Sequence, residues 1–225
     1  MSGANTRYRP WPNSGIYDEL IYKFPNSERV TGNFSQAYQD LFVLTMLQGK
    51  LDGRYFEIGA NDPRLLNNTA LLESLGWKGI SIEIIPELVD KFNNERTEKC
   101  YEADATTFDW RDAVRKKRWK SKRIDYLSCD CEPAMTTYEA LVNIPHDEYR
   151  FSVITYETDV YKDGEQPREM QRAFLTELGY QLVCGNVCND GAPFEDWWID
   201  PQVVPEEVWI PLQSNMTEAR SLFIK

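Results

Sequence analysis

Short apolar segments alternate with segments of helical periodicity along most of this chain, and that alternation restricts its fold more than any other feature. β-branched and aromatic runs bounded by turn-forming residues predict strands, and apolar residues at three- and four-residue spacing predict helices. The predicted strands are 54–58, 78–85, 99–103, 123–129, 151–156, 180–187 and 219–224. The predicted helices are 66–75, 87–96, 108–118, 134–143 and 167–178, with another that Ser35 caps and Gly49 ends.

Such alternation implies parallel strands joined by right-handed crossovers, with helices on both faces of the sheet. The last two predicted strands have no helical pattern between them, which indicates an antiparallel closing hairpin with a long loop. We therefore expect an α/β fold, a Rossmann-like three-layer αβα sandwich with a mostly parallel sheet of about seven strands. A chain of 225 residues is the length of one domain. Residues 35–225 are predicted to form it, after an N-terminal arm or lid at 1–34.

Charge and hydropathy narrow the classes of partner. The chain has no apolar run long enough to cross a bilayer, and Met1–Pro12 lacks the apolar stretch of a secretion signal, so we expect a cytoplasmic protein without a membrane partner. Its formal net charge is −11, whereas phosphate backbones are bound through Lys and Arg. The dense basic run 115–123 is interpreted as a solvated helix end, so nucleic acid is a poor candidate partner.

The cysteines follow neither a disulfide scaffold nor a metal site. Cys184 and Cys188 are four residues apart, but no second pair or histidine cluster completes a zinc site. Reduced and mostly buried thiols are expected at all five positions, namely Cys100, Cys129, Cys131, Cys184 and Cys188.

Carboxylates lie at or just beyond the ends of five successive predicted strands. In chain order they are Glu57 and Asp62, Glu83, Asp104, Asp130 and Glu132, and Glu157 and Asp159. Because ligands of open α/β sheets bind at the carboxyl ends of the strands, these acids are expected to meet around a ligand. So many negative charges would repel a pyrophosphate, and Gly59 lacks the further glycines of a dinucleotide-binding turn. A cationic ligand, a metal ion or both fit better. S-adenosylmethionine is such a ligand, with a sulfonium, an ammonium and a ribose diol that suits Glu83.

At these residues the chain resembles the FkbM family of class I methyltransferases, from about Ser35 to Phe151 and more loosely beyond. The matching segments are 35–36, 39–40, 55–63, 68–69, 75–79, Glu83 with Pro86, and 124–128 leading into 130–132. The family usually follows its fourth-strand acids with glycine and then a further acid, whereas this chain has Pro133 and Met135 there. Those departures concern the acceptor half of the site, since the cofactor residues lie elsewhere.

The resemblance implies that the turn 57–61 lies against the methionine part of S-adenosylmethionine, that Glu83 binds the ribose, and that Asp104 lies near the adenine. The implied cofactor-binding set is Gln39, Glu57, Gly59, Asn61, Asn68, Thr69, Glu83, Ile84, Asp104, Ala105 and Asp130.

Three interpretations remain open for the acids Asp130, Glu132, Glu157 and Asp159. Asp130, Glu157 and Asp159 could hold Mg²⁺ and lower the pKa of a coordinated hydroxyl. One of the four acids could instead act as a general base without metal. The third interpretation is structural, with Asp130 capping a helix and Glu157 paired with a Lys or Arg.

Three further features bear on the acceptor. His146 is a candidate base, although a lone loop histidine is usually solvated. Trp197 and Trp198, beside Glu195 and Asp196, are expected in the long loop, either stacking on a sugar or anchoring the loop in the core. Tyr161 and the aromatic arm residues are candidates to close the crevice or to form a homo-oligomer contact. The arm residues are Tyr8, Trp11 and Tyr17.

The leading hypothesis is an O-methyltransferase acting on a hydroxyl of a saccharide or other small metabolite. The alternatives are an N- or carboxyl-methyltransferase and a cofactor-binding scaffold without catalysis. A nicotinamide-dependent oxidoreductase is disfavoured by the lone glycine at position 59.

Overall fold

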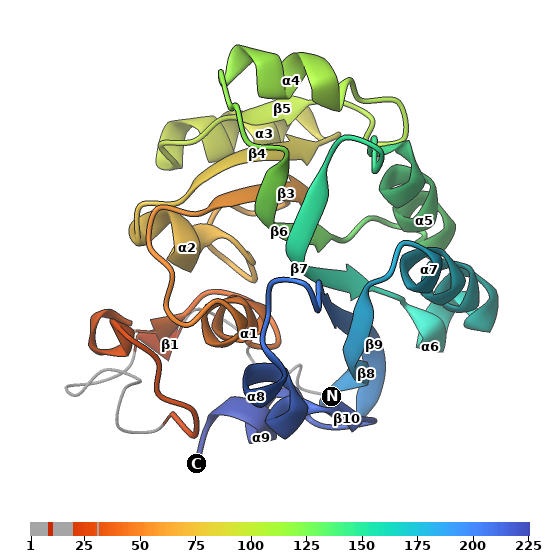
Figure 1. The fold of residues 1–225 in the computed structure, drawn as a ribbon. Helices are drawn as coiled ribbons and strands as arrows, with labels where there is room; N and C mark the ends of the chain where they lie inside the picture. The colour runs from red at the N-terminus through yellow and green to blue at the C-terminus, as the bar shows by residue number, and fades with distance from the viewer. Residues whose placement is uncertain (1–8, 11–19, 31) are drawn as a thin grey trace, which may run out of the picture.

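The computed structural model describes residues 9–10, 20–30 and 32–225, and its centre is an eight-stranded sheet (Figure 1). The strand order is β10-β8-β9-β7-β6-β3-β4-β5. The strands are β3 (Arg54–Ile58), β4 (Lys78–Glu83), β5 (Cys100–Glu102), β6 (Arg123–Cys129), β7 (Arg150–Glu157), β8 (Gln181–Asn189), β9 (Ala192–Ile199) and β10 (Ser214–Asn215). A separate two-stranded sheet pairs β1 (Arg9–Pro10) with β2 (Gly32–Asn33). The five strands from β3 to β7 are parallel to one another, which confirms the predicted Rossmann-like fold.

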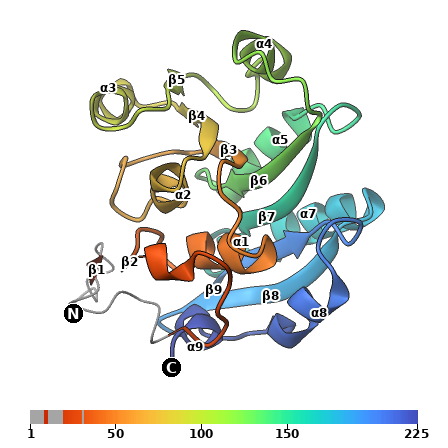
Figure 2. The same ribbon diagram turned by 60° about the vertical axis from the view of Figure 1, so that its left-hand side comes forward.

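Helices cover both faces of this sheet (Figures 1 and 2). They are α1 (Gln39–Met46), α2 (Ala70–Ser74), α3 (Pro86–Glu95), α4 (Trp110–Lys116), α5 (Ala134–Asn143), α6 (Val160–Asp163), α7 (Glu165–Glu177), α8 (Glu206–Trp209) and α9 (Ala219–Phe223), with 3-10 turns η2 (Ser27–Arg29) and η3 (Ile210–Leu212). No helix in residues 20–30 or 32–225 combines the length and hydropathy needed to cross a bilayer.

Successive strand residues enter two different cores, because side chains alternate across a sheet. One core joins Tyr55 and Trp197 to α1 and α2, and the other joins Phe56 and Trp198 to α4, α5 and α7. Both faces of the strands are therefore apolar, which explains why their sequences form nearly continuous hydrophobic runs. This arrangement confirms the three-layer sandwich.

The closing hairpin is antiparallel as predicted, but its second strand was placed wrongly. β8 pairs with β9 through a two-residue turn, Asp190–Gly191, in which both residues have positive φ. An Asp-Gly pair is the usual sequence of such a turn. The segment expected as a long loop therefore contains β9, and the predicted strand 219–224 is the helix α9.

The predicted helix 66–75 is shorter than expected, since residues 63–69 form a loop before α2. The N-cap position of α1 is Tyr38, with φ of 65°, and not Ser35 as predicted. The Ser35 hydroxyl still contacts the first turn of the helix, because it accepts from the backbone N–H of Asp40 at 3.4 Å and donates to Asp40 Oδ1 at 2.7 Å.

Part of the predicted arm packs against the domain. Leu20, Phe24 and Val30 are buried in the same core as α1. Tyr8, Trp11 and Tyr17 lie outside the described residues, so their proposed role as a lid stays a prediction.

Candidate functional site

Two adjoining cavities lie at the carboxyl ends of the parallel strands. The larger measures about 510 Å³ and the smaller about 140 Å³, and Gln36, Gly59, Asn61 and Asp130 line both. The larger is also lined by Ile82, Glu83, Ile84, Ile85, Leu88, Ala103, Asp104, Ala105, Cys131, Glu132, Thr136, Glu157 and Tyr161. The smaller is also lined by Glu57, Ala60, Asp62, Leu65, Leu66, Asn67, Asn68 and Ser128. No Lys, Arg or His among the described residues lines either cavity.

The turn after β3 forms the floor shared by the cavities. Gly59 has a φ of +74°, and a Cβ at this position would lie 1.6 Å from the carbonyl oxygen of Asp130. Glycine is therefore required by the close approach of β3 and β6 as well as by its backbone conformation. The turn brings Asn61 and Asp130 to the same edge of the cavities.

Glu57 lies at the back of the smaller cavity and is almost fully buried. Its Oε1 accepts a hydrogen bond from Thr69 Oγ1 at 2.8 Å, and its Oε2 accepts one from Ser81 Oγ at 2.6 Å. Burial raises the pKa of this carboxyl, while the charge of Arg96 and the two hydroxyl donors oppose the rise.

Asn68 lines the smaller cavity and has a buried side-chain acceptor without a partner. Its Nδ2 donates to Ser128 Oγ at 2.9 Å, whereas its Oδ1 is buried and has no hydrogen-bond partner in the described structure. Because an unpaired buried acceptor is costly, the arrangement suits a ligand that carries N–H donors.

Glu83 joins the turns that follow β3 and β4. Its Oε2 accepts from the backbone N–H of Asn61 at 2.9 Å, and its Oε1 accepts from those of Ile84 and Ile85 at 2.8 and 2.9 Å. A carboxylate has about four acceptor positions, so one remains for a ligand hydroxyl.

An apolar platform lies beside Glu83 in the larger cavity. Ile84 is 64% exposed and Ile85 47% exposed, which is unusual for isoleucines that line a cavity. Asp104 lies across from them at the end of β5, and hydrogen bonds from Thr106 lower its pKa. The platform and the carboxylates together suit a flat apolar ring joined to a polyhydroxyl group.

Asp130 and Glu157 form a carboxyl pair at the other side of the larger cavity. Glu157 donates a hydrogen bond to the Asp130 carboxylate, and burial raises the pKa of both groups. Glu195 faces Glu157 across the β7–β9 pairing and is fully buried, which raises its pKa to about 8. No cation of the described residues lines the cavity to neutralise the pair, so it holds a proton at neutral pH.

The other two predicted catalytic acids differ from this pair. Glu132 is exposed, lines the larger cavity, and pairs with Lys162 at 2.8 Å. Asp159 is 2% exposed, does not line the cavity, and lies 3.9 Å from Lys162 Nζ. Within the described part of the chain, no three His, Cys, Asp or Glu side chains are grouped to hold a metal ion, so the geometry does not support the Mg²⁺ site expected at Asp130, Glu157 and Asp159.

The structural interpretation of these acids does not fit either. The N-cap position of α5 is Pro133, so Asp130 does not cap that helix. Glu157 pairs with a carboxyl group, and no Lys or Arg in the described part of the chain forms an ion pair with it.

Most of the residues expected to bind the cofactor line the cavities, but two do not. Gln39 is buried behind them, where its Oε1 accepts from the backbone N–H of Ala37. Thr69 is buried between Glu57 and Arg96. The expected residues that line the cavities are Glu57, Gly59, Asn61, Asn68, Glu83, Ile84, Asp104, Ala105 and Asp130. Sequence patterns assigned no role to Gln36, Leu88, Cys131 or Thr136, although each lies one or two residues from a predicted strand end or helix start. Gln36 and Cys131 also fall in segments that resemble the FkbM family.

The remaining acceptor candidates lie elsewhere. His146 precedes β7, at the end of the sheet opposite the cavities, and its Nε2 contacts the carbonyl of Leu141 at 2.8 Å. Trp197 and Trp198 are buried in the two cores, and Trp197 stacks on Phe42 with ring centroids 4.8 Å apart. Of the two roles expected for the tryptophans, the structure supports anchoring in the core and not stacking on a sugar. Tyr161, in contrast, is 62% exposed at the rim of the larger cavity.

No protein-family model matches the chain, and no curated protein sequence does. Its fold is similar to several solved structures. A S-adenosylmethionine-dependent methyltransferase from Clostridium acetobutylicum has 6% identity and a TM-score of 0.49, over 74% of this chain and 92% of that one. An O-methyltransferase from Bacillus cereus in complex with SAH has 17% identity and a TM-score of 0.48, over 73% and 79%. An rRNA methylase from Streptococcus thermophilus has 11% identity and a TM-score of 0.47, over 71% and 94%. Likenesses at this level do not assign an activity to the chain.

Proposed function

We propose that the chain is a S-adenosylmethionine-dependent methyltransferase that acts on a hydroxyl of a saccharide or another small metabolite. The observation that carries the proposal is the lining of the two cavities, which offers carboxylate and amide acceptors and an apolar platform without any Lys, Arg or His from the described residues. This lining suits a cationic nucleoside and would repel the pyrophosphate of a nicotinamide cofactor.

The residues present fit the parts of this cofactor. Ile84 and Ile85 supply an apolar surface for the adenine, and the free acceptor position of Glu83 suits a ribose hydroxyl. The unpartnered Oδ1 of Asn68 and the buried Glu57 suit the ammonium of the methionine part. When bound, the cofactor supplies a methyl group that its sulfonium activates for in-line displacement.

The chain's own contribution to the chemistry is to orient the acceptor and take its proton. Asp130 and Glu157 lie at the ends of neighbouring strands and already share a hydrogen bond. The ionised oxygen of Asp130 is placed to accept the hydroxyl proton, and Glu157 stabilises Asp130 through that bond. Tyr161 at the rim suits a sugar ring through apolar contact.

The acidic lining also discriminates among acceptors. A carboxylate acceptor or a phosphate backbone would be repelled by Glu132, Asp130 and Asp104, whereas a neutral hydroxyl would not. This charge pattern favours a neutral acceptor over a carboxyl group or nucleic acid. Pro133 and Met135, where the chain departs from the FkbM pattern, line neither cavity. These departures therefore leave the lining of the cavities unaffected, and we include membership of the FkbM family in the proposal.

The test is transfer of a labelled methyl group from S-adenosylmethionine to pools of saccharides and hydroxylated metabolites. Wild type is expected to label a hydroxyl oxygen, Asp130→Asn to lose about tenfold or more of the rate because it removes the proposed base, and the exposed control Glu139→Gln to match wild type. The reaction is expected to proceed after treatment with EDTA. Label on nitrogen would favour an N-methyltransferase. Loss with EDTA and recovery with Mg²⁺ would favour the metal-assisted alternative at Asp130, Glu157 and Asp159. Binding of S-adenosylhomocysteine without turnover on any pool would favour a scaffold.

A further inference from the structure

Arg96 is a buried cation outside both cavities, in the connection between α3 and β5. Its side chain is 3% exposed, and four backbone or side-chain groups of the segment 63–73 accept its hydrogen bonds. A guanidinium buried in this way needs all its donors satisfied, so the groups around it are held in a fixed arrangement.

The contacts of Arg96 converge on the loop 63–69. Its Nη1 donates to the carbonyl of Pro63 at 2.8 Å and to Asn67 Oδ1 at 3.0 Å, and its Nη2 donates to Thr69 Oγ1 at 3.1 Å. Its Nε donates to Glu73 Oε2 at 2.7 Å, on the first helix after the loop. Arg96 therefore ties the beginning, the middle and the end of the loop to one point.

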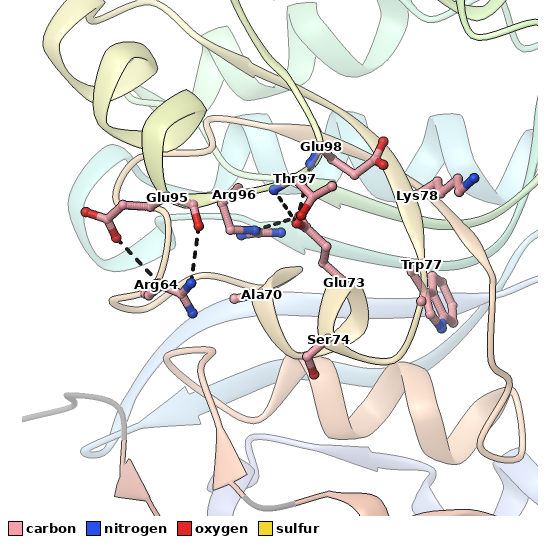
Figure 3. Close-up of a pocket in the computed structure, with 11 residues that line it drawn as sticks. Arg64, Ala70, Glu73, Ser74, Trp77, Lys78, Glu95, Arg96, Thr97 and Glu98 are labelled. Carbon is pink, nitrogen blue, oxygen red and sulfur yellow. Dashed lines mark hydrogen bonds and ion pairs between the residues drawn. The ribbon is translucent and has the colours of Figure 1, made fainter.

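The outer side of this contact borders a third cavity of about 360 Å³ (Figure 3). There Glu73 points from α2 toward Arg96, and its Oε1 also accepts from the backbone N–H of Thr97 at 2.7 Å. Glu73 thus fixes both the side chain of Arg96 and the backbone next to it. Arg64, on the same loop, instead reaches out to Glu95 and is 55% exposed.

The inner side of the same loop lines the smaller of the two site cavities. Asn67 Nδ2 donates to the carbonyl of Ala60 at 3.1 Å, which ties the loop to the turn after β3. Asn68, next in the chain, lines that cavity, and its Oδ1 is buried without a hydrogen-bond partner in the described structure. Thr69 Oγ1, which accepts from Arg96, donates to Glu57 Oε1 at 2.8 Å. One hydroxyl group therefore connects Arg96 to the buried carboxylate.

We propose that Arg96 is a positioning residue for the amino-acid half of the cofactor, acting through Thr69 on Glu57 and through the loop on Asn68. This inference rests on the proposed function. Arg96 also favours the ionised form of Glu57, because its positive charge opposes the rise in pKa that burial causes.

The nucleoside half of the site is held by a separate set of hydrogen bonds, which meets the loop 63–69 at the turn after β3. Glu83, Ile84 and Ile85 are fixed by backbone hydrogen bonds to the Glu83 carboxylate at the end of β4. Asp104 belongs to the turn after β5 and is held by Thr106. None of these groups contacts Arg96, so a change at Arg96 is expected to affect the two halves of a ligand unequally.

Titration calorimetry with two ligands separates these halves. S-adenosylhomocysteine carries both the nucleoside and the amino acid, whereas 5′-methylthioadenosine lacks the amino acid. Arg96→Met is expected to lower the affinity for S-adenosylhomocysteine by about tenfold or more and the affinity for 5′-methylthioadenosine by about threefold or less. Thr69→Val, which removes only the bridging hydroxyl, is expected to show the same inequality at a smaller size. Arg64→Met, on the outer face of the loop, serves as the matched control and is expected to leave both affinities unchanged.

The outcomes are distinct. If Arg96→Met and Thr69→Val lower the affinities for the two ligands equally, the positioning role is overturned while the proposed function stays intact. If Arg96→Met does not fold, Thr69→Val decides alone, and unchanged binding of S-adenosylhomocysteine in that variant overturns the inference. Failure of wild type to bind either ligand overturns both the inference and the proposed function.

Discussion

Replacement of Gly59 by alanine tests how closely β3 and β6 approach beneath the site. The new Cβ would lie 1.6 Å from the carbonyl oxygen of Asp130, whereas real contacts of this kind essentially never fall below 3.0 Å. The backbone must therefore shift by about 1.4 Å, the difference between these distances. The obstacle is a backbone group at the end of a central strand, which cannot rotate away as a flexible side chain could.

The cost has two parts. A left-handed backbone conformation costs an L-residue about 1–2 kcal/mol, and overpacking of a buried site costs about 1–3 kcal/mol more. The expected loss in the free energy of unfolding is about 2–5 kcal/mol. For a domain of this length, that corresponds to a fall in melting temperature of about 4–20 °C.

Gly191 provides the matched control. It has a φ of +82°, close to that of Gly59, but a Cβ added to it in the β8–β9 turn would meet nothing within 4 Å. Gly191→Ala should therefore lose only the conformational part, about 1–2 kcal/mol. Urea denaturation of the two variants measures the difference. A loss in Gly59→Ala equal to that in Gly191→Ala would refute the close approach of the two strands.

Three other predictions concern charge and exposure. Burial raises the pKa of Glu195 from 4.5 to about 8, so the unfolding free energy of wild type should fall as pH rises between these values. In Glu195→Gln, which cannot ionise, urea denaturation at successive pH values should show a smaller fall. Equal slopes of unfolding free energy against pH in the two proteins would contradict the assignment. Asp200 is buried between Arg123 and Arg150, so Asp200→Asn should lose about 3 kcal/mol of unfolding free energy by chemical denaturation. Asp112→Asn removes a solvent-accessible ion pair and should lose much less in the same assay. Ile84→Ser should lower the affinity for S-adenosylhomocysteine by about threefold to tenfold in calorimetry without lowering the melting temperature, because Ile84 is exposed until a ligand covers it. An unchanged affinity would exclude Ile84 from the apolar platform.

The sequence predicted the central strands well because both of their faces are buried. Tyr55 and Phe56 enter different cores, so the whole segment is apolar and is easily recognised. β9 was missed because Glu195 and Asp196 made its segment resemble a surface loop. Asp196 has a partner distant in the sequence, since it accepts a hydrogen bond from Arg172 Nε at 2.7 Å. Glu195 accepts one from Trp197 Nε1 at 2.5 Å, two residues further along the same strand. Neither partner is indicated by the hydrophobic pattern of the segment.

The site, like the fold, was predicted from the sequence only in part. Acids at successive strand ends were expected to meet because parallel strands end at one edge of a sheet, and Glu83, Asp104 and Asp130 do line one cavity. Spacing could not show which side chains face the cavity and which lie behind it. Asp159 and Thr69 lie behind it, and the role inferred for Arg96 depends on hydrogen bonds to a loop about thirty residues earlier in the chain.

The most direct test of the central claim is calorimetric titration of S-adenosylhomocysteine and of NAD⁺ into wild type and Glu83→Ala. The acidic, cation-free lining predicts saturable binding of S-adenosylhomocysteine, at least about tenfold weaker binding by Glu83→Ala, and no measurable binding of NAD⁺. Binding of NAD⁺ in preference to S-adenosylhomocysteine, or equal affinity of the two proteins for S-adenosylhomocysteine, would contradict the proposed cofactor site.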